Sequence, residues 1–363
     1  MEGLVMLEFY RDKTVLVTGH TGFKGSWLCE ILLEAGANVI GYALEPPTKP
    51  SLFEICGLER RMTSVIGDVR DYGHLEAVIR KYQPEIVFHL AAQPIVLTGY
   101  KDPAYTYHVN VMGTVNVLEA IRNNGCVKSF LNVTTDKVYE NNDLKDHPFK
   151  EDEKLDGFDP YSNSKSCSEL VTHSYRKCFF SKPGDCAIST ARAGNVIGGG
   201  DFSPDRIIPD CVRAVEAGEP IKVRNRNSTR PYQFVLEPLF VYLLIARRQY
   251  EDKRFSGYYN VGPDKVDAVT TGELVDQFCK KWGEGAHWED YTVLDAPHEA
   301  GYLALDNTLV KKTFSWEPVY HIGDALDRIV EWTKIYESDK QDQLKITKAM
   351  SKQIKLFSRG FCK

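Results

Sequence analysis

The sequence predicts a doubly wound α/β fold, followed by a smaller region of mixed α/β structure. Apolar, strand-like runs alternate with amphipathic, helix-like segments through the first half of the chain. Such alternation is typical of a parallel sheet covered by helices on both faces, with right-handed crossovers between the strands. A glycine-rich loop follows the first run directly, as it does in sheets of this class that bind nucleotides. After Arg192 the alternation gives way to glycine, proline and basic clusters, which predicts the smaller region.

The expected strands are short and rich in β-branched and aromatic residues. They cover residues 14–18, 39–43, 64–66, 85–90, 129–133 and 187–191. Between most of them lie segments with the apolar spacing of helices that cover a sheet. These expected helices cover residues 25–34, 72–82, 105–123 and 161–178.

Composition and charge argue against several classes of protein. The 363 residues carry a net charge of −5, which argues against nucleic acid as the main partner. No apolar run approaches the roughly 20 residues that span a bilayer, and the first residues lack the pattern of a signal peptide. The nine cysteines are scattered without a CxxC pair, so we expect neither a metal site nor disulfides. We therefore expect a cytoplasmic protein that does not bind membranes.

The glycine-rich loop between the first strand and the first helix predicts dinucleotide binding. Glycines let the backbone turn tightly and approach a pyrophosphate, which lies at the positive end of the helix. A plain strand-to-helix turn is the alternative interpretation, and the place of the loop at the start of the sheet favours the dinucleotide. The candidate residues are Gly19, Thr21, Gly22, Phe23, Lys24 and Gly25.

The second and third strands bear on the adenosine end of such a cofactor. An acidic residue at the end of the second strand usually binds the ribose of NAD. Here that strand ends without one, and Glu45 in the next loop is the nearest acid, so the choice between NAD and NADP stays open. After the third strand, Asp68 and Val69 are placed to meet the adenine, although Asp68 also suits a helix N-cap.

Tyr161 and Lys165 form a second motif, YxxxK. At about 1.5 Å rise per residue, the two side chains lie on one helix face, roughly 6 Å apart along the axis. A nearby cation lowers the pKa of a tyrosine, which makes this phenol a candidate base near neutral pH. A surface Tyr-Lys pair is the alternative interpretation.

These motifs, with Leu90, Ala91, Ala92 and Asn110, resemble the extended short-chain dehydrogenase/reductases over about residues 12–335. The resemblance implies NAD as the cofactor, with a tyrosine base, a lysine on the nicotinamide ribose, and Thr135 hydrogen-bonded to the reacting oxygen. The residues that it implies for cofactor binding are those of the glycine loop, Asp68, Val69, Leu90, Ala91, Ala92, Asn110, Tyr161 and Lys165.

The triplet Thr135-Asp136-Lys137 resembles the nucleotide-sugar 4,6-dehydratases within that family, and its lysine form is similar to the CDP-glucose 4,6-dehydratases. The resemblance implies oxidation at C4 of the hexose, loss of water across C5 and C6, and return of the hydride to C6, in a route to deoxysugars such as those of the lipopolysaccharide O-antigen. Asp136 would protonate the leaving hydroxyl and Lys137 would handle the C5 proton. Tyr139 is expected to pack on the nicotinamide.

The expected substrate residues lie mainly in the second half of the chain. Arginine suits a diphosphate because its planar fork donates two hydrogen bonds. The candidates are Gln93, Arg192, Asn195, Arg206, Arg230 and Glu299. The chain departs from the dehydratase pattern at Leu97, Gly301 and the polar stretch 141–153, and these departures bear on which sugar or nucleotide binds.

The resemblance also implies a division of the chain. Residues 1–192 form the NAD-binding domain, to which a segment around 232–262 returns, and residues 193–336 form the nucleotide-sugar domain. We expect residues 337–363 to be a solvated basic tail, and relatives imply a homodimer or homotetramer. Two other functions stay open: a nucleotide-sugar 4-epimerase, which needs no acid-base pair for elimination, and a protein that binds NAD without turnover.

Overall fold

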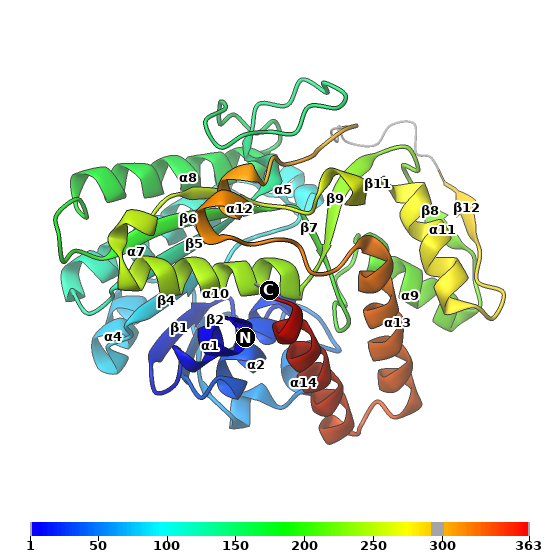
Figure 1. The fold of residues 1–363 in the computed structure, drawn as a ribbon, viewed down its shortest axis with the longest axis horizontal. Coiled ribbons are helices and arrows are strands. Elements are labelled where there is room, and N and C mark those ends of the chain that lie inside the picture. Colours follow the sequence, from blue (N-terminus) through cyan, green and yellow to red (C-terminus); the bar gives the residue numbers. More distant parts are fainter. Residues whose placement is uncertain (1, 292–300, 362–363) are drawn as a thin grey trace.

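Seven parallel strands form the main sheet of the molecule. The computed structural model describes residues 2–291 and 301–361, and the strand order is β10-β6-β5-β4-β1-β2-β3 (Figure 1). All neighbouring strands of this sheet are parallel. The predicted fold class is confirmed, and β5 and β6 each run two residues beyond their predicted ends. The strands are β1 Thr14–Thr18, β2 Asn38–Ala43, β3 Thr63–Ile66, β4 Ile86–His89, β5 Ser129–Thr135, β6 Ala187–Ala193 and β10 Tyr258–Val261.

Helices cover both faces of this sheet because its strands are apolar on both sides. In β1, Val15 and Val17 belong to the buried cluster that includes α2 and α10, whereas Leu16 belongs to the cluster that includes α4 and α7. This is the alternation expected for successive residues of a strand. The main helices are α2 Phe23–Glu34, α4 Tyr72–Tyr82, α7 Gly113–Asn124, α8 Pro160–Cys178 and α10 Leu236–Glu251.

The chain reverses its direction of winding between β1 and β4. From β1 the chain proceeds to β2 and β3, while β4, on the other side of β1, leads to β5 and β6. The last residue of β1, Thr18, is level with Tyr42 in β2 and with His89 in β4. A crevice outside the carboxyl ends of the strands is expected at such a reversal, and ligands of doubly wound folds bind there.

The second half of the chain adds two small sheets and one strand, β10, of the large sheet. In the three-stranded sheet, β9 pairs in parallel with β7 and antiparallel with β11, and the two-stranded sheet pairs β8 with β12. Figure 1 shows α9, α11, β8 and β12 grouped at one end of the molecule. The elements are β7 Asn195–Ile197, β8 Ile221–Val223, β9 Thr229–Phe234, β11 Ala268–Thr270, β12 Trp288–Asp290, α9 Ile207–Ala217, α11 Thr271–Trp282 and α13 Ile322–Ser338.

The single helix predicted over residues 105–123 is divided in the structure. Helix α6 (Pro103–Tyr107) leads into a π-helical turn, His108–Met112, before α7 begins. The turn contains Asn110, which is buried and bonded to two other segments. Such π-turns are often found at functional sites, and the apolar spacing of the sequence gives no sign of this one. The remaining helices are α1 Glu2–Glu8, α3 Leu52–Ile55, α5 Val96–Lys101 and α12 Thr308–Phe314.

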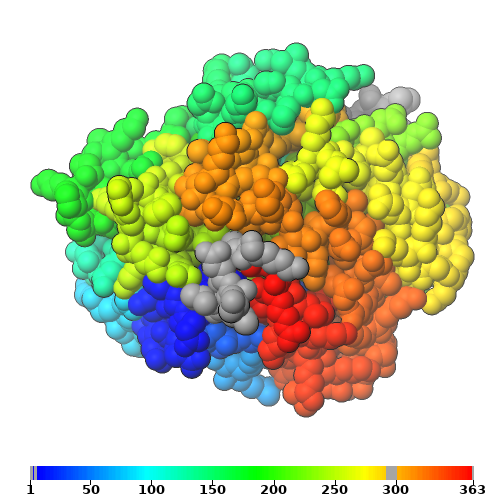
Figure 2. All heavy atoms as spheres, in the orientation of Figure 1, coloured from blue at the N-terminus to red at the C-terminus, as the bar shows by residue number. Residues whose placement is uncertain are grey.

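The predicted solvated tail is wrong, because its residues form the packed helix α14 (Gln343–Gly360). Phe357 is fully buried, with its ring centroid 4.9 Å from that of Phe240. Buried residues recur every three or four positions, from Ile346 to Phe357, and the lysines occupy the opposite face. Figure 2 shows the C-terminal residues, in red, lying against α13 as part of one continuous surface. Among the described residues, no helix is long and apolar enough to cross a membrane.

Candidate active site

The glycine loop forms a tight cradle at the carboxyl end of β1. Gly19 has a φ of +74°, and a Cβ on it would lie 2.7 Å from the backbone nitrogen of Ala91. A Cβ on Gly25 would lie 2.1 Å from the carbonyl oxygen of Gly19. Both contacts are with backbone atoms, so a side chain at either position would force the loop open. The loop is therefore packed closely against the segment that follows β4.

The cradle fits the diphosphate of a dinucleotide. Helix α2 begins at Phe23, and Gly22 at its N-cap supplies no side chain to its first backbone N–H groups. Unpaired N–H groups and the helix dipole together favour an anion at this end. Thr21 is turned away and donates to the carbonyl oxygen of Leu44, 2.9 Å away, which fixes the loop against the end of β2.

Lys24 extends toward Tyr242 of α10. Its Nζ lies 3.5 Å from Oη of Tyr242 and 5.6 Å from the centre of that ring. Burial lowers the pKa of Lys24 to about 7, and the cations of Lys165 and Arg206 act in the same direction. The charge of Lys24 therefore interacts with that of Lys165, a predicted catalytic residue, and with that of Arg206, a predicted substrate-binding residue.

Asp68 and Val69 follow β3 as predicted, but Asp68 has a partner within the chain. Its carboxylate accepts from Nε and Nη2 of Arg70, the shortest distance being 2.6 Å. The hydrogen bonds from Arg70 hold the pKa of Asp68 below its usual range. Val69 is buried against Gly113 of α7, and the valine side chain fills the space that a Cβ on this glycine would need. An adenine contact by Asp68 stays a prediction.

Asn110 fixes the segment that follows β4. Its Oδ1 accepts from the backbone nitrogen of Gln93 at 2.8 Å, and its Nδ2 donates to Ser164 of α8 at 2.9 Å. Gln93 is itself buried, and its side-chain amide binds Thr106 and the backbone of Ile95. These two bonds fix the orientation of the amide and use one of its two N–H donors and one of its carbonyl lone pairs. Leu90, Ala91 and Ala92 lie between β4 and Gln93, beside the glycine loop.

Helix α8 presents Tyr161 and Lys165 at its first turns. Asp159 caps the helix by accepting from the backbone nitrogens of Tyr161 and Ser162. Nζ of Lys165 donates to the carbonyl oxygen of Val133 in β5, 3.1 Å away, and burial lowers the pKa of Lys165 to about 8. These contacts place the amine between the helix and the end of the sheet.

The structure does not show the predicted net lowering of the pKa of Tyr161, because burial outweighs the charge of Arg206, which acts in the predicted direction. Burial raises the pKa of Tyr161 to about 12, and a hydrogen bond with Thr135 opposes that rise only in part. Burial is the larger influence because a phenolate loses hydration when it is removed from water. The hydrogen bond nevertheless brings the phenol of α8 together with the hydroxyl at the end of β5.

The triplet Thr135-Asp136-Lys137 lies at the junction of β5 and the short helix Asp136–Val138. Oγ1 of Thr135 donates to Oδ1 of Asp136 at 2.9 Å, and Nζ of Lys137 lies 3.2 Å from the same oxygen. Asp136 is fully buried, and its Oδ2 has no hydrogen-bond partner among the described residues. Buried carboxylate oxygens are normally bonded, so this one is available to a group that enters the site.

The structure brings only part of the predicted substrate set near this triplet. Asn195, at the start of β7, has its Oδ1 3.3 Å from Nζ of Lys137. Arg206 precedes α9 and pairs with Asp201 at 3.2 Å, and Arg230 is buried in β9. Glu299 lies outside the described residues. The prediction for Arg192 is corrected, because its side chain is fully buried and paired with Glu169.

The surroundings of Tyr139 differ from the prediction, and the sequence analysis missed His20. Tyr139 is buried, its ring stacks on Phe149 with the centroids 4.9 Å apart, and its hydroxyl donates to Asn260, so it has protein partners where a nicotinamide was expected. His20 lies over Gly41, where a Cβ would come within 2.3 Å of its ring. A glycine inside the strand pattern 39–43 was the signal for this close approach.

Comparisons with known proteins identify the family. A model of the family described as GDP-mannose 4,6 dehydratase matches residues 16–329. The CDP-glucose 4,6-dehydratase of Salmonella typhimurium is 46% identical over 336 residues, which cover 90% of this chain and 92% of that protein. The chain belongs to the nucleotide-sugar dehydratase and epimerase family of the extended short-chain dehydrogenase/reductases.

Solved structures show how widely this family shares the fold. The dTDP-glucose 4,6-dehydratase from Bacillus anthracis, in complex with NAD, has a TM-score of 0.75 at 23% identity and covers 91% of this chain and 98% of that one. The UDP-glucose 4-epimerase from Thermotoga maritima, with UDP-glucose, has a TM-score of 0.78 at 22% identity. The match covers 88% of this chain and 98% of that one. Dehydratases and epimerases of the family thus have the same architecture, and the side chains must distinguish them.

Proposed function

We propose that the protein converts CDP-D-glucose to CDP-4-dehydro-6-deoxy-D-glucose with NAD as its cofactor. The observation that carries this proposal is the Asp136–Lys137 pair, which lies beside the Tyr161–Lys165 pair. Oxidation at C4 needs only the second pair, whereas elimination of water needs an acid and a base as well. The 46% identity to the Salmonella typhimurium enzyme supports CDP-glucose as the substrate.

The glycine cradle and Tyr161 carry the oxidation. The N–H groups at the start of α2 bind the cofactor diphosphate, and Lys165 binds its nicotinamide ribose. When bound, NAD supplies a cationic ring that accepts the hydride of C4 and later returns it to C6. Tyr161 takes the proton of the 4-hydroxyl, while Thr135, its hydrogen-bond partner, orients the same oxygen. The new ketone acidifies the proton on C5.

Asp136 and Lys137 carry the elimination. The amine of Lys137 removes the C5 proton, and the carboxylic acid of Asp136 protonates the 6-hydroxyl, which leaves as water. After the hydride has reached C6, the ammonium of Lys137 returns a proton to C5. The sugar loses in total its 4-hydroxyl proton and its 6-hydroxyl, which together make one water. The proton that Tyr161 has taken returns to Asp136 through Thr135, which is hydrogen-bonded to both side chains, and this transfer restores the base and the acid.

One proton shared by this pair supplies both required forms. As an ion pair, Lys137 carries the proton and Asp136 carries none. Moving that proton across the 3.2 Å from Nζ to Oδ1 yields a neutral amine and a carboxylic acid together.

The remaining assignments complete the proposal. Arg206, Arg230, Asn195 and Glu299 bind the nucleotide sugar within a domain formed by residues 193–336, and Gln93 of the NAD-binding domain contributes to the same site. Residues 1–192 and the returning segment around 232–262 bind NAD, although NADP stays an alternative. We propose a cytoplasmic homodimer or homotetramer that supplies deoxysugars such as those of the O-antigen.

The test is an incubation with CDP-glucose that carries deuterium at C4. The proposal predicts loss of one water, no net reduction of NAD, and deuterium at C6 of the product. Parallel reactions with dTDP-, GDP- and UDP-glucose test the nucleotide. An epimerase would return the deuterium to C4 without loss of water, and that result would overturn the proposal. NAD binding without any change in the sugars would favour the non-catalytic alternative.

A further inference from the structure

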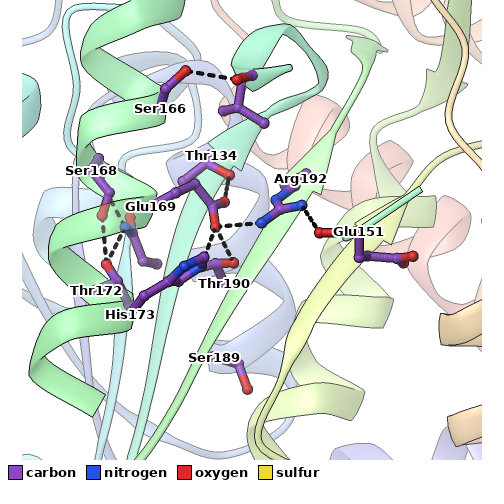
Figure 3. Close-up of polar contacts among 12 residues, drawn as sticks. Thr134, Glu151, Ser166, Ser168, Glu169, Thr172, His173, Ser189, Thr190 and Arg192 are labelled. Atoms are coloured by element: carbon purple, nitrogen blue, oxygen red, sulfur yellow. Dashed lines mark hydrogen bonds and ion pairs between the residues drawn. The ribbon is translucent and has the colours of Figure 1, made fainter. Parts of the chain in front are cut away.

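A fully buried ion pair lies beneath the catalytic residues. Glu169 of α8 and Arg192 of β6 are 3.0 Å apart, and neither side chain has any exposed surface. Figure 3 shows both at the centre of a group of polar side chains from the helix and the sheet. A buried ion pair is weak evidence for stability by itself, because removal of its charges from water offsets their attraction. Its other contacts therefore indicate what it does.

The carboxylate of Glu169 binds both strands that lie under α8. Thr134 of β5 donates to Oε1, and Thr190 of β6 donates to Oε2 at 2.7 Å. His173, one turn further along α8, has its Nε2 3.2 Å from Oε2. Although burial alone would raise the pKa of Glu169, these contacts and Arg192 hold it far below its usual range. Glu169 is therefore an anion that joins α8 to β5 and β6.

The guanidinium of Arg192 binds the chain beyond the triplet. One of its nitrogens donates to Oη of Tyr139 at 2.7 Å and to the carbonyl oxygen of Glu151 at 3.0 Å. Oη of Tyr139 donates in turn to Asn260 of β10 at 2.6 Å. Arg192 thus fixes the place where the chain leaves the short helix 136–138.

The contacts of the ion pair lie on either side of the catalytic triplet. Thr134 immediately precedes residues 135–137, and Tyr139 follows them after one residue. Glu169 lies four residues after Lys165, which is one turn along the same face of α8. Neither Glu169 nor Arg192 reaches the surface of the site, so neither can touch the substrate.

We propose that the Glu169–Arg192 ion pair is a positioning device that sets Asp136 and Lys137 against Tyr161 and Lys165. This inference rests on the proposed function. Oxidation uses Tyr161 and Lys165 of α8 with Thr135 at the end of β5 in support, whereas elimination depends entirely on groups that follow β5. A shift between the helix and the strand would leave the oxidation possible while misplacing the acid and base of the elimination. The ion pair therefore couples the two half-reactions.

The test compares variants that separate positioning from stability. Arg192→Met leaves a buried carboxylate without its cation, which destabilises the fold strongly, whereas Glu169→Gln/Arg192→Met removes both charges and restores most of that stability. The matched control is Glu30→Gln, which breaks another ion pair with a buried carboxylate, 2.6 Å from Arg61 and near the opposite edge of the sheet. Thermal unfolding, KM, kcat and the steady-state fraction of bound NADH are measured for each with CDP-glucose.

The proposal predicts a folded double variant with nearly unchanged KM. Its kcat should fall on the order of 10²-fold, as for a displacement of about 1 Å at a reacting group. Bound NADH should accumulate, because oxidation continues while elimination is slow. The Glu30→Gln control should lose stability without accumulating NADH.

Two results would overturn the inference in distinguishable ways. A folded double variant with wild-type kcat and no NADH accumulation shows that the ion pair is only structural, while the proposed function stands. A wild-type protein that removes no water from CDP-glucose overturns the proposed function and the coupling together.

Discussion

Lys137 and Asp136 are adjacent in sequence and also in space, with Nζ of the lysine 3.2 Å from Oδ1 of the carboxylate. The second carboxylate oxygen of Asp136 has no partner among the residues described. A Cβ on Gly194 would lie 3.3 Å from that oxygen, so the glycine keeps the space beside it clear. One oxygen thus contacts the lysine, and the other has space beside it for a group of the substrate.

Asp136→Asn should stop elimination while leaving oxidation. An amide cannot donate an acidic proton to the 6-hydroxyl, and such proton transfer typically contributes about 10²- to 10⁴-fold. We expect kcat for water loss to fall within that range and bound NADH to appear by its near-ultraviolet absorbance. Asp156→Asn is the control, because its exposed carboxylate pairs only with Lys154 in the contacts described. Equal water loss by Asp136→Asn and wild type would rule out Asp136 as the acid.

Gly25→Ala should weaken cofactor binding. The new Cβ would lie 2.1 Å from the carbonyl oxygen of Gly19, so the cradle must open. We expect a Kd for NAD raised at least tenfold, or about 1.4 kcal/mol, by titration calorimetry. Gly73→Ala is the matched control, because its Cβ would meet only Asp71, at 3.7 Å, on the exposed side of α4. Unchanged NAD affinity in Gly25→Ala would place the cofactor elsewhere.

Glu237→Gln should stabilise the protein in alkaline solution. Burial raises the pKa of Glu237 to about 8, while its Oε1 accepts from the backbone nitrogens of Val319 and Tyr320. A carboxylic acid whose pKa is higher in the folded protein than in the unfolded chain stabilises the fold less as the pH rises from the unfolded-state pKa to the folded-state pKa. Between pH 4.5 and 8 the free energy of unfolding of the wild type should therefore fall relative to the variant.

At pH 8 the free energy of unfolding of Glu237→Gln should exceed that of the wild type by an amount on the order of a few kcal/mol. At pH 4.5 and below it should be small, because glutamine keeps an acceptor oxygen for both backbone groups. Urea unfolding at the two pH values measures it. A difference that does not change with pH would show that Glu237 is not responsible.

Phe357→Ala should destabilise the fold, although it lies in the segment predicted to be a solvated tail. The ring is fully buried and contacts Phe240 and Tyr320. Removing such a ring typically costs about 3–5 kcal/mol. Leu356→Ala is the neighbouring control, with 39% of its surface exposed. Similar unfolding free energies for the two variants would contradict the packing of α14.

The first half of the fold could be predicted closely because its signals are local. Helix α4 begins at Tyr72 and ends at Tyr82, as predicted, since its apolar spacing and its Asp71 cap are adjacent in the chain. The predicted helix over 105–123 concealed a π-turn because Asn110 is held by Gln93 and Ser164, which are distant in sequence. The tail was misjudged because its lysines form only one face of α14, and the opposite face is apolar.

The sequence by itself determined the glycine cradle, the YxxxK pair and the acid-lysine triplet, because each depends on residues that are neighbours in the chain or one helical turn apart. Only the tertiary structure decided the pKa of Tyr161 and the partners of the charged side chains. It raised the pKa of Tyr161 by burial, joined Asp68 to Arg70, and placed Arg192 against Glu169 rather than at the substrate. Burial and long-range pairing depend on which elements pack together, and no short stretch of sequence contains that information.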